Sequence, residues 1–221
     1  MGGLNMPAKY SVKEIFLSVQ GEGAQTGRPS VFVRFAGCNL WTGREKDRAS
    51  AVCKFCDTEF VGTDGIGGGV FDTPDALAQE AMSYWPRNQG QPIGDPWVIC
   101  TGGEPLLQLN SSLVKAFHKA GFKVAVETNG TIKAPKGIDW LCVSPKADAA
   151  LVQQSGDELK LVYPQKENSP ADFAELSFKQ FSLQPLDDPQ KDKHRQAAFE
   201  YCMQNPKWRL SLQTHKWLGV R

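Results

Sequence analysis

The sequence has no run of eighteen or more apolar residues, so it contains no candidate for a membrane-spanning helix. It also has almost no net charge: 25 Lys and Arg stand against 24 Asp and Glu, which gives +1. Such a balance provides no electrostatic attraction to nucleic acid or to an anionic membrane. Residues 1–7 lack the basic and apolar regions of a signal peptide. We therefore expect a cytoplasmic protein.

The chain also lacks internal repeats, low-complexity runs and linker-like segments. Hydrophobic residues make up 41% of its 221 residues, which is enough for a large core. We therefore expect one domain over residues 1–221. Residues 39–70 are rich in Gly, Asp and Thr and show no periodicity, so we expect an irregular insertion there.

Strand and helix patterns alternate along the rest of the chain, which favours an α/β fold with parallel strands joined by crossover helices. We expect three helices, over residues 73–85, 110–120 and 190–204. The expected strands cover residues 31–35, 97–100, 122–127, 140–143, 158–163, 178–185 and 209–213. About six of them end in polar segments, at the edge where parallel sheets bind ligands. Because six strands are too few for a closed eight-stranded barrel, we expect an open, partial (β/α)6-type barrel.

Cysteine is sparse, and six cysteines in a cytoplasmic chain do not indicate a disulfide framework. Cys100, Cys142 and Cys202 lie inside expected strands or helices, which predicts burial. The remaining three form one local group: Cys38, fourteen residues, then the Cys-x-x-Cys pair Cys53 and Cys56. Three thiolates would leave one iron of a 4Fe–4S cluster without a protein ligand and open to a bound molecule. The alternative is a structural zinc site with a fourth ligand elsewhere.

A second group follows an expected strand directly, in the order Thr101, Gly102, Gly103, Glu104 and Pro105. Paired glycines allow a ligand to approach the backbone closely, and Glu104 adds a carboxylate. Taken alone, this segment would be an ordinary strand-to-helix turn. Beside the three cysteines it indicates a cofactor site.

The two groups together resemble the radical S-adenosylmethionine (SAM) superfamily, although the usual spacing there is Cys-x-x-x-Cys-x-x-Cys. Fourteen residues in place of three, eleven more than usual, are tolerated in one family that this chain resembles nearly end to end. The matching segments are residues 18–23, 33–40, 56–58, 101–105, 127–130, 144–146, 183–185 and 213–216. They are similar to 7-carboxy-7-deazaguanine synthase, a queuosine-pathway lyase.

This resemblance implies a radical ring contraction of 6-carboxy-5,6,7,8-tetrahydropterin to 7-carboxy-7-deazaguanine with loss of ammonia. It implies one 4Fe–4S cluster per chain, SAM and Mg²⁺ as cofactors, a homodimer, and a flavodoxin-like external electron donor. The implied cluster ligands are Cys38, Cys53 and Cys56, and Thr58 would bind Mg²⁺. No separate catalytic side chain is implied, because SAM supplies the radical.

The implied SAM site consists of Phe55, Cys56, Asp57, Gly102, Gly103, Glu104, Glu127, Asn129, Ser144, Pro145, Lys146, Gln184, Pro185 and Leu186. The implied substrate site consists of Val19, Gln20, Gly21, Glu22, Arg34, Thr101, His215 and Lys216. A guanidinium such as that of Arg34 can pair with the substrate carboxylate, and Glu22 can accept from the N–H donors of a guanine-like edge.

Each role has a structural alternative. Arg34 would otherwise form a surface ion pair, Thr58 a turn hydrogen bond, and Glu127 and Asn129 an ordinary loop. His215 and Lys216 would otherwise be a solvated tail, and His118 and His194 are expected at the surface of their helices.

Two other functions compete with the synthase. One is a radical SAM activase that installs a glycyl radical on a partner protein, against which residues 20–23 and 213–216 argue. The other, from a different class, is a zinc-stabilised binding module, which would be colourless.

Overall fold

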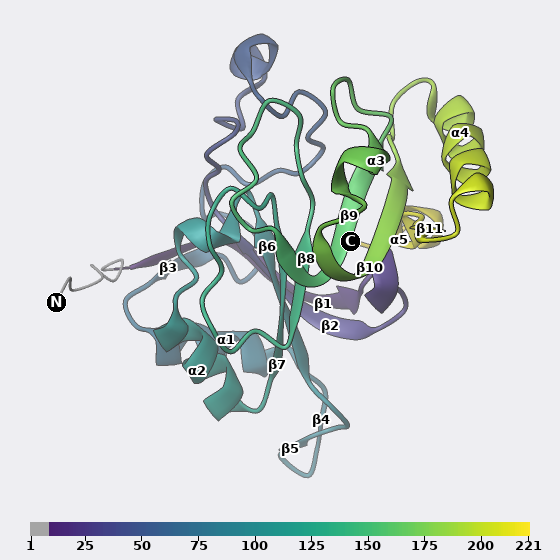
Figure 1. The fold of residues 1–221 in the computed structure, drawn as a ribbon. Coiled ribbons are helices and arrows are strands. Elements are labelled where there is room, and N and C mark those ends of the chain that lie inside the picture. Colours follow the sequence, from purple (N-terminus) through teal and green to yellow (C-terminus); the bar gives the residue numbers. More distant parts are fainter. Residues whose placement is uncertain (1–8) are drawn as a thin grey trace, which may run out of the picture.

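The structure is a computed structural model that describes residues 9–221. Residues 1–8, which include the segment on which the expected lack of a signal peptide rests, lie outside the described range. Within residues 9–221, nine strands form one sheet in the order β11-β10-β9-β8-β7-β6-β2-β1-β3, and β4 and β5 form a separate hairpin that projects from the body of the molecule (Figure 1).

The strands are β1 (Tyr10–Val19), β2 (Pro29–Phe35), β3 (Gly69–Phe71), β4 (Arg87–Asn88), β5 (Gln91–Pro92), β6 (Trp97–Gly102), β7 (Lys123–Thr128), β8 (Trp140–Val143), β9 (Ser155–Tyr163), β10 (Ser177–Pro185) and β11 (Trp208–Leu210). The α-helices are α1 (Pro74–Ser83), α2 (Ser111–Ala120), α3 (Pro170–Phe173), α4 (Lys191–Gln204) and α5 (Thr214–Leu218). Short 3-10 helices are η1 (Gly23–Gln25), η2 (Glu45–Ser50) and η3 (Pro105–Leu107).

The seven strands expected from the sequence form the parallel part of the sheet, from β2 through β6, β7, β8, β9 and β10 to β11. β1 and β3, which were not predicted, extend it in antiparallel fashion. In β1 the pairing register shifts between Val12 and Glu14, which interrupts the two-residue alternation that marks a strand in a sequence.

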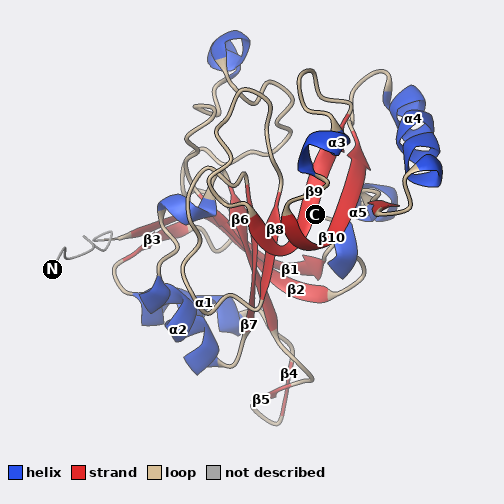
Figure 2. Cartoon of the chain, in the orientation of Figure 1, coloured by secondary structure: helices blue, strands red, loops and turns tan. Residues whose placement is uncertain are grey.

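Helices α1 and α2 lie together on one side of the sheet (Figure 2) and start as predicted. The Thr73 hydroxyl accepts from the Ala76 amide at 3.1 Å, and Asn110 caps α2 in the same way. Gly121 ends α2 at φ 102°, a conformation that favours glycine. The expectation of a crossover helix between successive strands fails twice, because β7–β8 and β8–β9 are joined by loops without any helix.

The main core fills the space between the sheet and α1 and α2, and a smaller core lies under α4. Cys100, Cys142 and Cys202 are buried in these elements, as predicted. The prediction of a surface position for His194 is wrong: its ring is buried and lies 3.1 Å from an Asp188 carboxylate oxygen. Because the strands from β2 to β10 run parallel, the segments that follow them meet at one edge of the sheet.

Candidate active site

The segment between Cys38 and the Cys-x-x-Cys pair is irregular apart from η2, as expected. Arg48 ties this segment to the cysteine loop: its Nη1 donates to the carbonyl oxygens of Lys54 at 2.9 Å and Cys56 at 3.0 Å. The guanidinium also lies over the Trp41 ring, 4.2 Å from its centroid. Through Arg48, the segment that contains the eleven extra residues therefore stabilises the loop that carries Cys53 and Cys56.

The three predicted cluster cysteines are neighbours. Cys38 and Cys56 both pack against the buried Trp41, Ala51 and Phe60. A hydrogen bond from the Cys53 thiol lowers the pKa of Cys56 to about 6, whereas burial raises the pKa of Cys38. Within residues 9–221 no three His, Cys, Asp or Glu side chains are arranged to hold a metal ion. Three soft sulfur donors with one acidic thiol nevertheless fit an iron–sulfur cluster.

The turn after β6 lies directly against the first cysteine. A Cβ on Gly103 would stand 2.0 Å from the Gly37 carbonyl oxygen and 2.9 Å from Cys38 Cβ. Gly102 has φ 124°, and a Cβ there would stand 2.2 Å from the Phe35 carbonyl oxygen. Only glycines allow this turn and the end of β2 to approach each other so closely.

Glu104, in the same turn, faces the protein and not the cavity. Its carboxylate is fully buried and accepts from the Leu106 amide at 2.9 Å, the Thr128 hydroxyl at 2.7 Å and the Asn129 amide at 2.8 Å. Burial raises the pKa of this carboxyl group, and the three donors act in the opposite direction. Glu104 thus joins the turn after β6 to the turn after β7.

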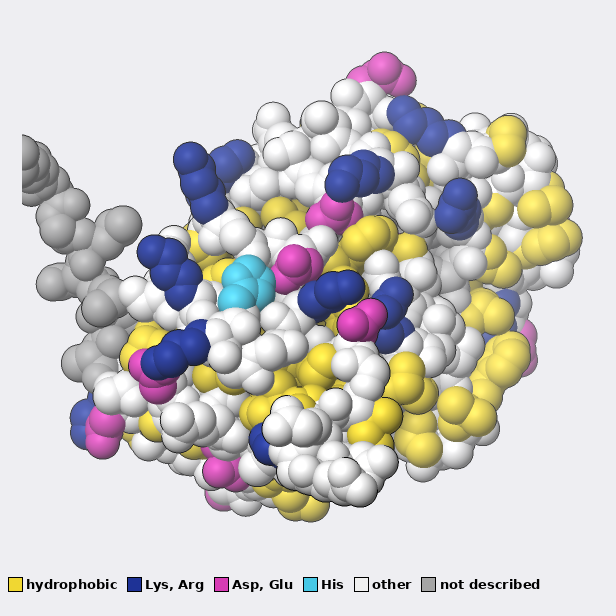
Figure 3. Space-filling view, turned by 90° about the horizontal axis from the view of Figure 1, so that it is seen from below, with side chains coloured by type: hydrophobic (Ala, Val, Ile, Leu, Met, Phe, Trp, Pro, Cys, Tyr) yellow, Lys and Arg dark blue, Asp and Glu magenta, His cyan; other side chains and the backbone are white. Residues whose placement is uncertain are grey.

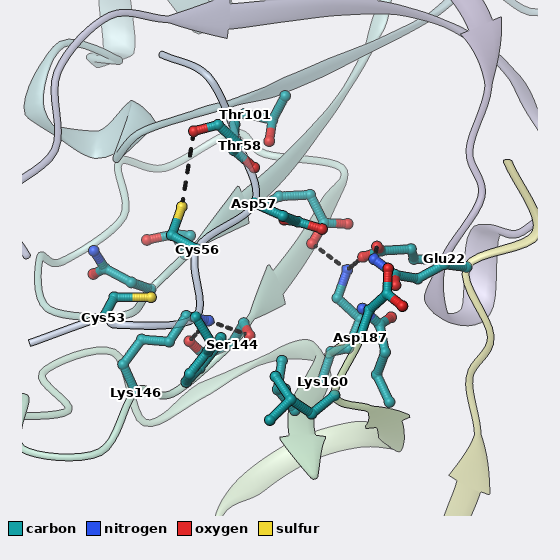
Figure 4. A pocket seen from close by; sticks show the side chains of 18 of the residues that line it. Glu22, Cys53, Cys56, Asp57, Thr58, Thr101, Ser144, Lys146, Lys160 and Asp187 are labelled. Atoms are coloured by element: carbon teal, nitrogen blue, oxygen red, sulfur yellow. Dashed lines mark hydrogen bonds and ion pairs between the residues drawn. The ribbon is translucent and has the colours of Figure 1, made fainter. Parts of the chain in front are cut away.

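A cavity of about 200 Å³ opens beside the cysteine loop, and we call it the first cavity. Its wall includes Cys53, Thr58 and eleven of the fourteen predicted SAM residues: Phe55, Cys56, Asp57, Gly103, Glu127, Asn129, Ser144, Lys146, Gln184, Pro185 and Leu186. Gly102, Glu104 and Pro145 are not in this wall. Figure 4 shows Cys53, Cys56 and Lys146 on one side of the cavity and Glu22 and Lys160 on the other.

A larger cavity of about 440 Å³, which we call the second cavity, adjoins the first. All eight predicted substrate residues line it: Val19, Gln20, Gly21, Glu22, Arg34, Thr101, His215 and Lys216. Arg34 is not a surface residue, because its side chain is only 20% exposed and its Nε donates to Glu14 at 2.8 Å. Most of the predicted SAM residues therefore line the first cavity and all of the predicted substrate residues line the second, while Glu22, Thr101, Asp57 and Glu127 line both.

Seven residues line both cavities, and we call them the junction: Glu22, Asp57, Thr58, Thr101, Glu127, Lys160 and Gln213. Lys160, on β9, is 5% exposed, and its Nζ lies 2.7 Å from Glu22 Oε2 and 2.9 Å from Glu127 Oε2. The other carboxylate oxygens accept from Gln213 Nε2 at 2.8 Å and Gln20 Nε2 at 3.1 Å.

The two carboxyl groups that Lys160 contacts differ in their pKa. Burial alone would raise the pKa of Glu22, but the charge and hydrogen bond of Lys160 outweigh burial and lower that pKa to about 2. For Glu127 burial prevails, and its pKa is raised. Lys160 was missed at the sequence level. Its signal was a buried parallel strand with charged side chains at alternate positions, Glu158 and Lys160, which indicates a polar face inside the fold.

The C-terminal segment returns to the second cavity. The Thr214 amide donates to the Gly21 carbonyl oxygen at 2.9 Å, and a Cβ on Gly21 would meet the His215 ring at 2.0 Å. Lys216 pairs with Asp57 at 2.7 Å and Asp187 at 2.6 Å. His215 and Lys216 are thus held in the cavity wall by α5, a helix that the sequence did not indicate.

On the face seen in Figure 3, basic and acidic side chains lie next to one another with hydrophobic side chains between them, in keeping with a net charge of +1. Among the helices of residues 9–221, none has the length and apolar character needed to cross a membrane.

Comparison with known proteins identifies the relatives of this chain. A scan against models of protein families gave no match. The 7-carboxy-7-deazaguanine synthase of Caulobacter vibrioides is 59% identical over 211 residues, which cover 96% of this chain and 99% of that protein. The synthase of Bordetella pertussis is 57% identical with the same coverage. The crystal structure of QueE from Escherichia coli superimposes with a TM-score of 0.64 at 23% identity, covering 93% of this chain and 94% of that one.

Fold and site together define a mixed α/β protein in which a cavity lined by two cysteines adjoins a second, larger cavity. The structural neighbour, at its low identity, supports the fold alone. The curated relatives are similar over nearly their whole length. The chain belongs to the 7-carboxy-7-deazaguanine synthase family.

Proposed function

We propose that this protein is a radical SAM lyase that converts 6-carboxy-5,6,7,8-tetrahydropterin to 7-carboxy-7-deazaguanine with loss of ammonia, in queuosine and 7-deazapurine biosynthesis. Family membership supports the activity. The structural observation that carries the proposal is the pair of cavities: one begins at the cysteine loop, and the other shares seven wall residues with it.

The first cavity would hold SAM next to a 4Fe–4S cluster on Cys38, Cys53 and Cys56. Together these cofactors supply a 5′-deoxyadenosyl radical that takes a hydrogen atom from the substrate. The residues of this cavity would bind and orient SAM, and Gly103 lets the turn after β6 pack directly against Gly37 and Cys38. Gly102, Glu104 and Pro145 support that wall from outside it. We further propose that the parallel strands form the open, partial barrel of a radical SAM domain over residues 1–221, with residues 39–70 as its cluster-binding insertion.

The second cavity would hold the pterin. Arg34, already fixed by Glu14, would pair with the substrate carboxylate, and Glu22 would accept from its N–H donors. Thr58, at the junction, would bind Mg²⁺ together with that carboxylate and water, since Mg²⁺ retains waters and borrows substrate oxygens. His215 and Lys216 would exclude water, which a primary radical requires.

Nothing in the structure or in the relatives favours a glycyl-radical activase or a zinc module. A homodimer and a flavodoxin-like electron donor remain predictions from the family resemblance, and a cytoplasmic location remains a prediction from the sequence.

Anaerobic reconstitution with iron and sulfide, followed by assay with SAM, dithionite, Mg²⁺ and the pterin, tests the proposal. A brown protein that forms 7-carboxy-7-deazaguanine and recycles SAM is expected. Cleavage of SAM without conversion of the pterin would reject the substrate, and a colourless zinc protein would reject the whole proposal.

A further inference from the structure

The Glu127–Lys160 ion pair is buried at the point where the two cavities meet. Glu127 is on β7 and Lys160 on β9, and their side chains are 20% and 6% exposed. Glu127 Oε2 lies 2.9 Å from Lys160 Nζ. Both residues line the first and the second cavity. Neither the composition nor the spacing of motifs singles out this pair.

The position matters because of the reaction, and this inference rests on the proposed function. A radical generated on SAM in the first cavity can reach a substrate in the second cavity only near the junction. The carbon and nitrogen atoms that react must therefore lie beside the seven junction residues.

The chemistry needs a base and an acid at that place. The substrate and the product differ by one ammonia, and SAM is recycled, so the elimination itself is not a redox step. A carbon must lose a proton to form the new double bond of the five-membered ring. The departing nitrogen must gain a proton to leave as ammonia.

Four junction residues have ionisable side chains, and two of these are poorly suited to act as the acid or the base. The side chain of Asp57 is 57% exposed and bound to Lys216 at 2.7 Å, away from a dry reaction site. Glu22 and Glu127 are each held by Lys160 and by one glutamine, but Lys160 lowers the pKa of Glu22 to about 2, which makes Glu22 the weaker base. Burial gives Glu127 a raised pKa and thus a stronger affinity for a proton. Glu127 and Lys160 remain.

We propose that Glu127 and Lys160 are the proton-transfer residues of ammonia elimination. After ring contraction, the Glu127 carboxylate takes the C–H proton, and the electron pair of that bond forms the carbon–carbon double bond. The neighbouring C–N bond breaks, and the nitrogen keeps its electron pair and takes a proton from the Lys160 ammonium. Ammonia leaves, with Glu127 protonated and Lys160 neutral.

The short contact between the two side chains closes the cycle. The proton on Glu127 passes across the 2.9 Å contact to Lys160 and restores the carboxylate and the ammonium. No external acid, base or oxidant is consumed. The two transfers also assist each other, because protonation of Glu127 removes a negative charge that holds the pKa of Lys160 high.

The test compares Glu127→Gln with the wild-type protein, each loaded with its cluster. Loss of a general base predicts a fall of about 100-fold or more in the rate of product formation. Because Glu127 also lines the cavity proposed for SAM, hydrogen abstraction, followed as deuterium transfer from labelled substrate to SAM, is measured at saturating SAM and should fall far less than product formation. A ring-contracted amine with the mass of the substrate should accumulate. Glu127→Asp, which retains a carboxylate, should recover part of the rate. Lys160→Arg, which keeps the positive charge but does not give up a proton, should stay slow and show that the fold persists.

Two further comparisons separate chemistry from structure. Because the residues act as one unit, the double variant E127Q/K160M should be no slower than E127Q alone. Lys179→Gln, which removes an exposed lysine paired with Asp157 at 2.7 Å, is the control and should behave as wild type.

Hydrogen abstraction that falls in parallel with product formation would overturn the inference, since Glu127 would then act in binding. Turnover of E127Q at the wild-type rate, or additive losses in the double variant, would do the same. A wild-type protein that leaves the pterin unchanged would instead reject the proposed function, and this inference with it.

Discussion

Replacing Glu104 with Gln tests whether the glutamate of the glycine-rich turn is present for structure as well as for cofactor binding. The carboxylate accepts from three donors: two through Oε1, at 2.9 Å and 2.7 Å, and the Asn129 amide through Oε2 at 2.8 Å. Glutamine has one carbonyl oxygen, so in either amide orientation its NH₂ group faces at least one of these donors.

The magnitude follows from that mismatch. An unpaired buried donor costs about 1–3 kcal/mol, and the hydrogen bonds lost were made to a charged acceptor. Burial of the charge, which raises the pKa of Glu104, offsets part of the loss. We expect a net destabilisation of about 2 kcal/mol, which for a chain of this length lowers Tm by about 4–8 °C.

Scanning calorimetry of the iron-free protein measures this change. Glu200→Gln is the matched control, since Glu200 is exposed on α4 and accepts from Gln196 at 2.7 Å. A Tm for E104Q within about 1 °C of E200Q would refute the reasoning, because three donors would then tolerate an amide.

Three other predictions follow from single contacts. Gly103→Ala places a Cβ 2.0 Å from the Gly37 carbonyl oxygen and should lower the free energy of unfolding, measured by calorimetry, by about 1–3 kcal/mol. Gly69→Ala is the control, because the nearest atom to its Cβ is 3.9 Å away, and equal Tm values for the two variants would contradict the prediction. Arg48→Ala removes two hydrogen bonds to the cysteine loop and a cation–π contact, together worth about 2 kcal/mol, and also an ion pair with the exposed Glu45 carboxylate. The amides of residues 53–58 should therefore exchange hydrogen faster in the iron-free protein. If these amides exchanged at the same rate in R48A as in the control Arg44→Ala, Arg48 would not stabilise the cysteine loop. For Glu22, burial is outweighed by Lys160, and its pKa falls from 4.5 to about 2. The contribution of ionised Glu22 to the free energy of unfolding is therefore complete above pH 4.5 and is lost as the pH falls toward 2. The free energies of unfolding by urea of the wild type and of Glu22→Gln should converge in that range. A difference between them that does not change with pH would contradict this prediction.

The predicted elements that the structure reproduces are those with a strong local signal. Helices α1 and α2 start at Thr73 and Asn110 because each cap satisfies free amides within one turn. The parallel strands are short apolar runs ended by Gly or polar residues. Strand β1 and helix α5 gave no such signal: the first has an irregular register, and the second is five residues long and is fixed by contacts to Gly21, Asp57 and Asp187.

The sequence by itself determined the chemical components: three cysteines, a glycine pair that follows a strand, and the residues of eight short segments. These depend on residue type and spacing, which a chain displays directly. Only the tertiary structure decided how the components divide into two cavities and which residues stand between them. Lys160 illustrates the reason: it lies 138 positions from Glu22 and 33 from Glu127, and the pairing of β9 into the sheet brings all three together. Long-range contacts of this kind leave no local pattern, because the strands that create them are separated by whole segments of chain.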